Sequence, residues 1–400
     1  MNIANGYQQA APAFIEKFRP YCHDAPCVLS VERYRSLKAL GRLLQKAITV
    51  MLRKHDQYAD LMPMSERDRQ VMQLCEPFPF RLGTFRTDFV IDETGAIKII
   101  EMTTRQPLNG YFISGFSRAL GLERAKALKL DGLVDDYPRF LDYLGKHFGN
   151  VRHVCVIRGY ERMGDYKIYP DIFRAAGIDC HIILPEEVSA KLDLLKDAAV
   201  VEELNHAEIR KFADREIEAI TAAGVLNDFR NLFIAHDKRF FGVLTSPRFQ
   251  NQELTPSERD LLSGYLVPTY LPGHDLHHWQ DAYENQNAWI LKHRLFGKGE
   301  QIYAGELTEQ TVWKGLFDSG EIRNMVLQPF LRQRRFKGRI GQEERNDFVA
   351  GTLLYFNDEF FGPGIYRASS SPVTNKGDDR KITQLVADIS PDRKDVYHLG

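Results

Sequence analysis

The segment from residue 151 to residue 188 constrains the fold most strongly, because it contains two strand-like runs joined by a helix-like one. It reads VRHVCVIRGYERMGDYKIYPDIFRAAGIDCHIILPEEV. This order is typical of a βαβ unit, whose strands lie parallel in one sheet. The following DAAVVEELN supplies a third strand and HAEIRKFADREIEAITAAG a helix. We therefore expect a small parallel α/β domain, and the lack of G-x-G-x-x-G in RGYERMGDY disfavours a dinucleotide fold.

The regions on either side of this unit have different patterns. Residues 30–75 carry apolar side chains at helical spacing, and two β-rich runs predict a hairpin at about 83–104. A mostly helical stretch then leads to a boundary near Gly149. From about residue 234 strands alternate with glycine-rich turns, which suggests antiparallel sheet with few helices, and the polar stretch 369–400 is loop-like. The expected fold is α/β (α+β), in three parts: residues 1–149, 150–233 and 234–400.

Charge and composition exclude several kinds of partner. The 400 residues carry 53 basic and 54 acidic side chains, so a net charge of -1 creates no global field for nucleic acid or an anionic membrane. The five cysteines are an odd, scattered number, which favours free thiols in a reducing compartment. No signal-like N-terminus occurs, and no apolar run reaches about 18 residues. We expect a cytoplasmic protein that binds neither nucleic acid nor membrane, and we leave a homodimer open.

Charged side chains interrupt the apolar hairpin FRTDFVIDETGAIKIIEMTTRQ at residues 85–106. Because successive side chains of a strand point to opposite faces, Arg86 and Asp88 share one face of the first strand. If DETG closes the hairpin with an even-numbered loop, Arg86 lies opposite Glu101. Arg86, Asp88 and Glu101 then form one polar face. On the second strand the same alternation groups Ile99, Glu101 and Thr103.

Three interpretations of this polar face stay open. Mg²⁺ is usually held by one or two carboxylates together with substrate phosphates, so Asp88 and Glu101 are candidate metal ligands. A structural ion pair with Arg86 is the second interpretation. The third is a solvated strand face, where surface pairing contributes about 0 to 1 kcal/mol.

A second stretch with potential chemistry is WILKHRLFGKGEQIYAGE. Here an apolar strand carries Lys292, and Gly297, Lys298 and Gly299 form a flexible basic turn. Glycine permits close backbone approach and lysine suits phosphate as a point charge. The P-loop pattern G-x-x-x-x-G-K-[ST] is absent, and an ordinary hairpin turn is the alternative.

The remaining candidates are single residues whose roles depend on context. Lys238 precedes an amphipathic segment in AHDKRFFG, and the strand VLQPFL ends at a proline where backbone groups can meet a base edge. Arg367 follows a Gly-Pro-Gly turn, a position suited to clamping carboxylate or phosphate. The histidines of GHDLHHW do not have H-E-x-x-H spacing, which disfavours a metal site there. No nucleophile elbow or Cys-His pairing is apparent.

The order of these segments resembles the circularly permuted ATP-grasp ligases, a group that includes eukaryotic glutathione synthetase and the synthetase domain of bacterial glutathionylspermidine synthase. In that group an R-x-D strand and an E-x-N strand precede a small parallel α/β domain, a lysine, and a strand lysine with a glycine-rich lid. Here these segments are Arg86-Thr87-Asp88, Glu101-Met102-Thr103, the 151–188 unit, Lys238, and Lys292 with GKG. The resemblance covers about residues 80 to 370.

The resemblance implies ATP and Mg²⁺ as cofactors, and antiparallel sheets that form the nucleotide cleft. It implies the following roles: Mg²⁺ binding by Asp88, Glu101 and Thr103; contact with the reacting groups by the catalytic Arg86 and Arg367; nucleotide binding by Lys238, Lys292, Gly297, Lys298, Gly299 and Gln328. Two departures concern the metal. Thr103 replaces the family asparagine, and the lid lacks both the proline after its lysine and the glutamate that glutathione synthetase adds as a ligand.

The activity that this resemblance implies is the joining of a carboxylate and an amine. ATP would phosphorylate the carboxylate, and an amine would attack the acyl phosphate to give an amide or peptide bond. We expect small amino-acid-like or peptide-like substrates for the carboxylate and the amine. Thr103 and the altered lid motivate one alternative, a nucleotide-binding regulatory or scaffold protein without turnover. The other alternative is an ATP-dependent phosphotransferase.

Overall fold

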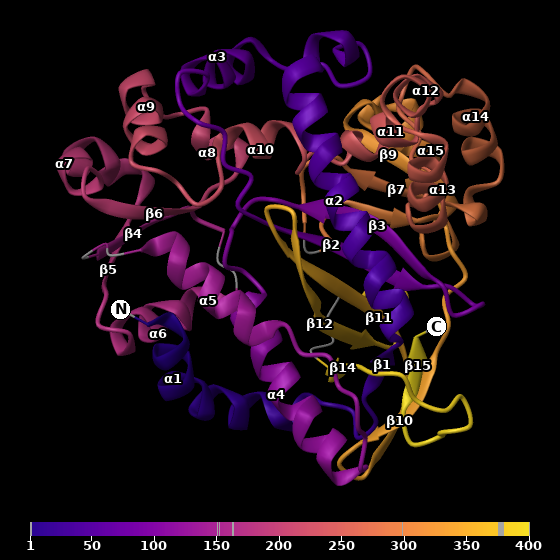
Figure 1. Ribbon diagram of the computed structural model, residues 1–400. Helices are drawn as coiled ribbons and strands as arrows, with labels where there is room; N and C mark the ends of the chain where they lie inside the picture. The colour runs from indigo at the N-terminus through magenta and orange to yellow at the C-terminus, as the bar shows by residue number, and fades with distance from the viewer. Residues whose placement is uncertain are drawn as a thin grey trace.

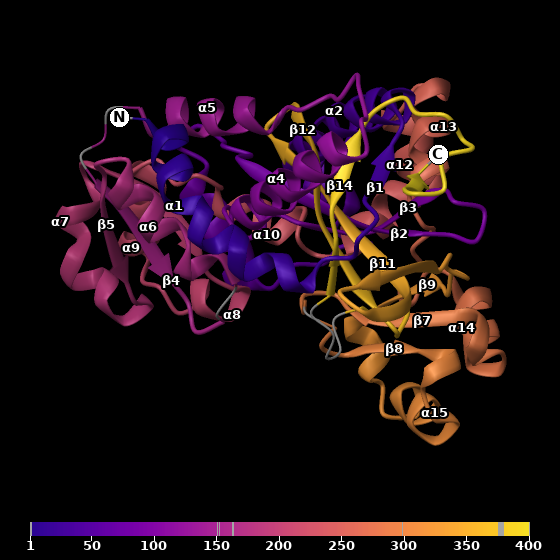
Figure 2. The same cartoon turned by 90° about the horizontal axis from the view of Figure 1, so that it is seen from below.

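A computed structural model describes residues 2–149, 151, 153–161, 164–297, 299–374 and 380–399. In these residues the chain forms a six-stranded sheet and three sheets of three strands. Figure 2 shows the six-stranded sheet in the middle, with the parallel sheet toward one end and a small antiparallel sheet toward the other. The predicted α/β (α+β) class, with antiparallel sheets and a small parallel one, is confirmed.

The six-stranded sheet is antiparallel throughout, and the predicted hairpin forms two neighbouring strands at one side of it. Its strands are β2 (Thr84–Ile91), β3 (Ile97–Thr103), β10 (Phe336–Ile340), β11 (Glu343–Phe356), β12 (Glu359–Ser369) and β13 (Arg380–Ile382). Arg367 therefore lies inside β12, and the Gly-Pro-Gly before it is not a turn as expected. Two register shifts between β11 and β12 accommodate those residues within the strand.

Helices cover both faces of this sheet, because residues alternate between two apolar cores along β11. Leu353 and Tyr355 pack under α2 (Val31–Lys54), whereas Leu354 and Phe356 pack under α4 (Tyr111–Ala127) and α5 (Tyr137–Phe148). Figure 1 shows α2 lying across the sheet. Three further helices complete these layers: α1 (Ile3–Phe18), α3 (Glu66–Cys75) and α10 (Phe229–Ile234).

The hairpin register differs from the predicted one. Five residues, 92–96, separate β2 from β3; within them Asp92 N–H donates to the Ala96 carbonyl at 3.0 Å, and Gly95 takes a φ of +89°. An irregularity at Ile100 then shifts the register, so Asp88 lies opposite Glu101 and Arg86 opposite Thr103. The predicted Arg86–Glu101 pairing is therefore wrong.

The same irregularity changes which side chains share a face. Ile99 pairs with Phe89 and is fully buried in the apolar core, whereas Glu101 pairs with Asp88 on the polar face. The extra residue Ile100 allows this change of side. The expected grouping of Ile99 with Glu101 is therefore wrong, although Glu101 and Thr103 do share a face.

The predicted βαβ unit forms a parallel sheet of order β5-β4-β6. Its elements are β4 (His153–Arg158), α6 (Tyr169–Ala175), β5 (Asp179–Ile183), α7 (Leu192–Leu195) and β6 (Ala198–Glu203). The predicted single helix after β6 is instead two, α8 (His206–Ile209) and α9 (Asp214–Ala222), because Ala213 N–H donates to Glu216 and starts a new helix. The division of the chain at 149/150 and 233/234 stays a prediction.

The expectation of few helices after residue 234 is wrong. The segment forms α11 (Arg239–Thr245), α12 (Pro247–Glu253), α13 (Pro256–Tyr265), α14 (Leu276–Glu284) and α15 (Gln310–Asp318). Every residue from Arg239 to Leu244 is buried, and a helix apolar on all sides has no 3.6-residue pattern that distinguishes it from a strand. The predicted strands do form an antiparallel sheet of β7 (Trp289–His293), β8 (Ile302–Ala304) and β9 (Met325–Pro329).

The last sheet joins the two ends of the chain. The strand β1 (Cys27–Leu29) runs parallel to β14 (Gln384–Val386) and β15 (Tyr397–Leu399), so residues 380–399 are more regular than the loop we expected. Short 3₁₀ helices lie at Arg19–Tyr21, His55–Tyr58, Gly164–Lys167, Pro185–Lys191, Gln286–Ala288, Gly305–Leu307 and Glu321–Asn324. All five cysteines are free thiols. Over the described ranges, the helices are all too short or too polar to cross a membrane.

Candidate functional site

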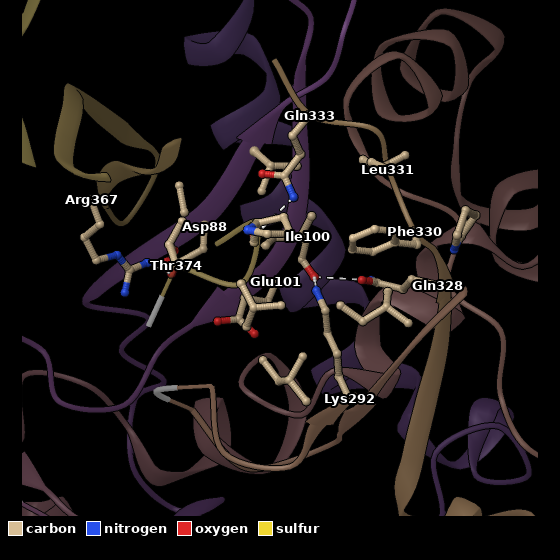
Figure 3. Close-up of a pocket in the computed structure, with 17 residues that line it drawn as sticks. Asp88, Ile100, Glu101, Lys292, Gln328, Phe330, Leu331, Gln333, Arg367 and Thr374 are labelled. Carbon is tan, nitrogen blue, oxygen red and sulfur yellow. Dashed lines mark hydrogen bonds and ion pairs between the residues drawn. The ribbon is translucent and has the colours of Figure 1, made fainter. Parts of the chain in front are cut away.

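A cavity of about 650 Å³, its open mouth included, lies between the polar face of the hairpin and the β7–β9 sheet. One end is charged, with Asp88, Glu101, Lys292 and Arg367, and the other is apolar around Gln328. Figure 3 shows the acidic pair between Arg367 on one side and Gln328 and Phe330 on the other. The central sheet therefore supplies the carboxylates, and the small sheet supplies a lysine and an amide.

The two carboxylates at the charged end already have cationic partners. Asp88 pairs with Arg367 at 2.6 Å, and Glu101 pairs with Lys238 at 3.3 Å. Burial raises the pKa of Glu101, but the cations Lys238, Lys292 and Arg367 outweigh it and hold the pKa below its ordinary value. Glu101 is thus kept ionised, as a cation ligand must be.

The second oxygen of Asp88 points to a further ligand. Among the described residues, Asp88 Oδ1 has no hydrogen-bond partner although it is buried. A buried carboxylate oxygen without a partner is costly unless something else neutralises it. Asp88 and Glu101 face each other across the ladder, and two carboxylates with phosphate and water complete a Mg²⁺ shell. The donor set therefore fits Mg²⁺, although the described chain has no cluster of three His, Cys, Asp or Glu ligands.

Lys292 brings a buried cation to this end of the cavity. Its side chain is 3% exposed, and burial lowers its pKa to about 8 while Glu101 and Asp88 oppose that shift. Lys292 Nζ donates to the Ile100 carbonyl at 3.5 Å. A buried ammonium with so weak a bond can interact strongly with a phosphate.

The apolar end is a slot with one unsatisfied amide. Gln328 Nε2 donates to Thr269 Oγ1 at 2.8 Å and to the Ile100 carbonyl at 3.2 Å. Within the described chain its Oε1 accepts nothing, although Gln328 is only 1% exposed. Phe330 and Leu331 line the same end. The slot therefore offers apolar walls and one free acceptor, which suits a flat ring that carries an amino group.

The remaining sequence candidates lie at the borders of this cavity or away from it. Lys238 Nζ donates to the Phe296 carbonyl at 2.6 Å, so it links Glu101 to the segment before the glycine-rich turn. Gly297 lies against the Arg105 guanidinium rather than over Lys292. Gly299 has a φ of +77°, and Lys298 lies outside the described residues.

The structure places Arg86 and Thr103 two residue pairs further along the hairpin than Asp88 and Glu101. Arg86 packs against the start of α4, where a Cβ at Gly110 would lie 2.5 Å from Arg86 Nη1. Neither Arg86 nor Thr103 is among the described residues that line the cavity. Both share the hairpin face with Asp88 and Glu101, so they lie beyond the charged end.

Sequence reasoning missed a buried carboxyl group near Arg86. Asp165 accepts the backbone N–H groups of Phe112 and Ile113 at 3.2 and 3.4 Å, at the start of α4. Burial raises its pKa to about 7, against the pull of these N–H groups and of Arg86. Its position in the loop after β4, at the carboxyl end of a parallel strand, was the signal that could have identified it.

This carboxyl group predicts a pH effect on stability. Its folded pKa of about 7 exceeds its ordinary value of 3.8, so the folded state binds more protons between these values and stability falls as pH rises from about 4 to 7. Asp165→Asn should remove that loss and raise the free energy of unfolding at pH 8, relative to pH 5, by on the order of 2 kcal/mol. Urea unfolding at pH 5 and at pH 8 measures this difference in the free energy of unfolding.

The exposed Asp171, on α6, provides the control for this measurement. Asp171→Asn should leave the difference between pH 5 and pH 8 unchanged. If Asp165→Asn shows the same pH dependence as the unmodified protein, the Asp165 carboxyl is already ionised at pH 5 and its assignment is wrong.

Comparison with known proteins agrees with this geometry. A family model described as the AnkG N-terminal domain matches residues 40–234. The ATP-grasp enzyme ankG of Aspergillus thermomutatus is 23% identical over 435 residues, which cover 91% of this chain and 87% of that protein. The structure of a glutathione synthetase-like effector (GSS30) from Globodera pallida, in its apo form, superposes with a TM-score of 0.55 at 12% identity, covering 91% of this chain and 89% of the effector.

These similarities confirm the resemblance drawn from the sequence motifs. The sequence relative is an ATP-grasp enzyme, and the structural neighbour shares the arrangement of sheets over most of both chains. The chain therefore has a glutathione synthetase-like fold, and its sequence resembles that of an ATP-grasp enzyme.

Proposed function

We propose that this protein is an ATP-dependent carboxylate–amine ligase that forms an amide or peptide bond through an acyl phosphate. The observation that carries the proposal is the cavity whose charged end holds Asp88, Glu101 and Lys292 and whose apolar end holds Gln328. One end suits Mg²⁺ and phosphates, and the other suits a base. The substrates we propose are small amino-acid-like or peptide-like molecules.

Binding of the nucleotide would use both ends of the cavity. The adenine ring would lie between the apolar side chains near Phe330 and Leu331, with its amino group donating to Gln328 Oε1. The phosphates would lie near Lys292, whose ammonium lacks a strong partner. Asp88 and Glu101 would hold Mg²⁺, which neutralises charge on the phosphates during transfer.

The ion pairs at the charged end keep these carboxylates ready for a cation. Arg367 and Lys238 offset the charges of Asp88 and Glu101 in the nucleotide-free protein, and the nearby cations hold the pKa of Glu101 below its ordinary value despite burial. In the nucleotide complex both cations would also attract the phosphates. Arg86 lies two residue pairs away on the same face, where it would stabilise the acyl phosphate.

The two chemical steps need no enzyme nucleophile. A substrate carboxylate oxygen attacks the γ-phosphorus and ADP leaves. The amine then attacks the acyl carbon, phosphate leaves, and the amine loses a proton. The protein's residues position these groups and offset their charge, which suits a site composed of carboxylates, lysines and arginines.

A screen with hydroxylamine tests the proposal without knowledge of the amine. Hydroxylamine captures acyl phosphates as hydroxamates, so candidate carboxylates can be tested one at a time with Mg²⁺ and ATP. We expect ADP and hydroxamate in equal amounts for the correct acid. A screen of amines with that acid then gives the natural product.

The other outcomes of this screen separate the competing functions. A stable phosphorylated product that hydroxylamine leaves unchanged would indicate a phosphotransferase. Tight ATP binding without ADP release across acids and amines would indicate a regulatory or scaffold protein. Either result contradicts the ligase proposal.

A further inference from the structure

A second cavity, of about 1200 Å³ with its open mouth included, lies between the parallel sheet and the segment that follows β7. Its lining includes Asn205 and His206, which follow β6, and Arg294 and Phe296, which follow β7. Open sheets bind ligands outside the carboxyl ends of their parallel strands, and this cavity has that position. Over the described residues it shares no lining side chain with the nucleotide cavity.

Three arginines line this second cavity, and each donates to a carboxylate: Asp68 and Asp237 lie outside the lining, whereas Glu161 belongs to it. Arg105 donates to Glu161 at 2.5 Å, and Arg294 donates to Asp237. The third, Arg210, donates to Asp68 through two bonds of 2.7 and 2.8 Å. These bonds fix the guanidinium groups in place before any ligand arrives, which reduces the entropy lost on binding.

The arginines keep hydrogen-bonding capacity for a ligand. Among the described contacts, Arg294 bonds Asp237 through Nη1 alone, and Arg210 bonds Asp68 through Nε and Nη2 alone. Guanidinium groups with a free edge are the usual partners of carboxylates, which they bind with two parallel bonds. Asp237 is ionised, because Arg239 and Arg294 lower its pKa to about 2 despite burial, and these two arginines offset its negative charge.

The cavity also adjoins the reacting end of the nucleotide site. Lys238 N–H donates to the Arg294 carbonyl at 2.9 Å and its Nζ donates to the Phe296 carbonyl at 2.6 Å, while the same Nζ pairs with Glu101. Lys238 therefore bonds Glu101 of the nucleotide cavity and also Arg294 and Phe296 of the second cavity. A molecule bound by the arginines would place its far end beside the proposed phosphate site.

We propose that this second cavity binds the carboxylate substrate, and that the substrate is a small acid with at least two carboxylates. One carboxylate would be held by Arg294, Arg105 and Arg210, and the other would reach the phosphate near Lys238. Only the role of the second carboxylate, which would react with ATP, rests on the proposed ligase function. Binding of the first follows from the arginines alone, and it can be measured without nucleotide.

The pair Arg294 and Arg239 offers a matched test. Both donate to Asp237, but Arg239 does not line the cavity. Replacement of either by lysine keeps the charge beside Asp237, whereas only Arg294→Lys removes the planar guanidinium from the cavity. Calorimetry with glutarate and glutamate, and with neutral glutaramide, measures binding to the full chain. Circular dichroism shows whether each variant is folded.

We expect the diacids to bind at least tenfold more tightly than the diamide. Arg294→Lys should weaken diacid binding about tenfold, and Arg239→Lys should leave it unchanged. Arg105→Lys should act like Arg294→Lys, because Arg105 also lines the cavity. The proposal is overturned if the diamide binds as well as the diacids, or if Arg294→Lys and Arg239→Lys have equal effects. Affinity for an ATP analogue is measured separately, so a failed nucleotide site is distinguishable from a failed acid site.

Discussion

Glu101→Gln is expected to reduce Mg²⁺-dependent ADP formation by at least about a hundredfold, the scale at which metal sites respond to lost ligand support. Glutamine keeps the shape of the side chain but removes the charge that Lys238, Lys292 and Arg367 now share. Without that charge, Asp88 and Glu101 together carry one negative charge, which is too little to offset a divalent cation. The rate is measured by ADP release over a range of Mg²⁺ concentrations, and the deficit should shrink as Mg²⁺ rises.

The control for this variant lies on the same hairpin. Glu93 is exposed in the β2–β3 loop, so Glu93→Gln removes the same charge from the same element and should leave the rate unchanged. Asp88→Asn should behave as Glu101→Gln does. Normal turnover in both variants would mean that the polar face is a structural ion-pair network, which was one interpretation of the sequence.

Lys292→Met is expected to weaken binding of a non-hydrolysable ATP analogue by about ten- to a hundredfold, equal to about 1.4 to 2.7 kcal/mol. Methionine fills the same buried space but removes the ammonium, which makes only a long bond to the Ile100 carbonyl beside the proposed phosphates. Calorimetry gives the affinity directly. The exposed Lys337 of β10 is the control, since Lys337→Met removes a positive charge far less buried than that of Lys292.

The same experiment separates a nucleotide role from a structural one. If Lys292 served only to neutralise Glu101, its loss would lower the free energy of unfolding without changing the affinity of folded protein. Unchanged affinity in a folded Lys292→Met variant would contradict the phosphate assignment. A matching loss for Lys337→Met would show that the effect is a general electrostatic one.

The sequence predicted those parts of the fold that depend on local patterns. Strand alternation placed Arg86 and Asp88 on one face, and the βαβ pattern predicted the parallel sheet of β4, β5 and β6. Both signals arise from side-chain periodicity over a few residues. The order of motifs was sufficient to indicate the ATP-grasp fold, because each short motif constrains the others.

The hairpin register could not be predicted, because distant residues determine it. The irregularity at Ile100 exposes a carbonyl that accepts from Lys292 and Gln328, residues that follow it by 192 and 228 positions. No pattern within the hairpin contains that information. The prediction also assumed an even loop, whereas an odd number of residues, the five from 92 to 96, separates the two strands.

The sequence predicted the positions of some site residues but not of others. Asp88, Glu101, Lys292, Gln328 and Arg367 meet in one cavity, as their motif order led us to expect. The placement of Arg86 against α4 and of Gly297 against Arg105 depends on contacts between separate elements, which the sequence does not display. Among the helices after residue 234, α11 was missed because a helix buried on all sides has no amphipathic period.

The central claim, transfer of phosphate from ATP to a carboxylate, is tested most directly by an oxygen label. The acid found in the hydroxylamine screen is prepared with ¹⁸O in its carboxylate, and the released phosphate is examined by mass spectrometry. An acyl phosphate predicts one ¹⁸O atom in each phosphate, because the carboxylate oxygen that attacks the γ-phosphorus leaves with it. Phosphate without ¹⁸O, at the same rate of ADP release, would contradict the account.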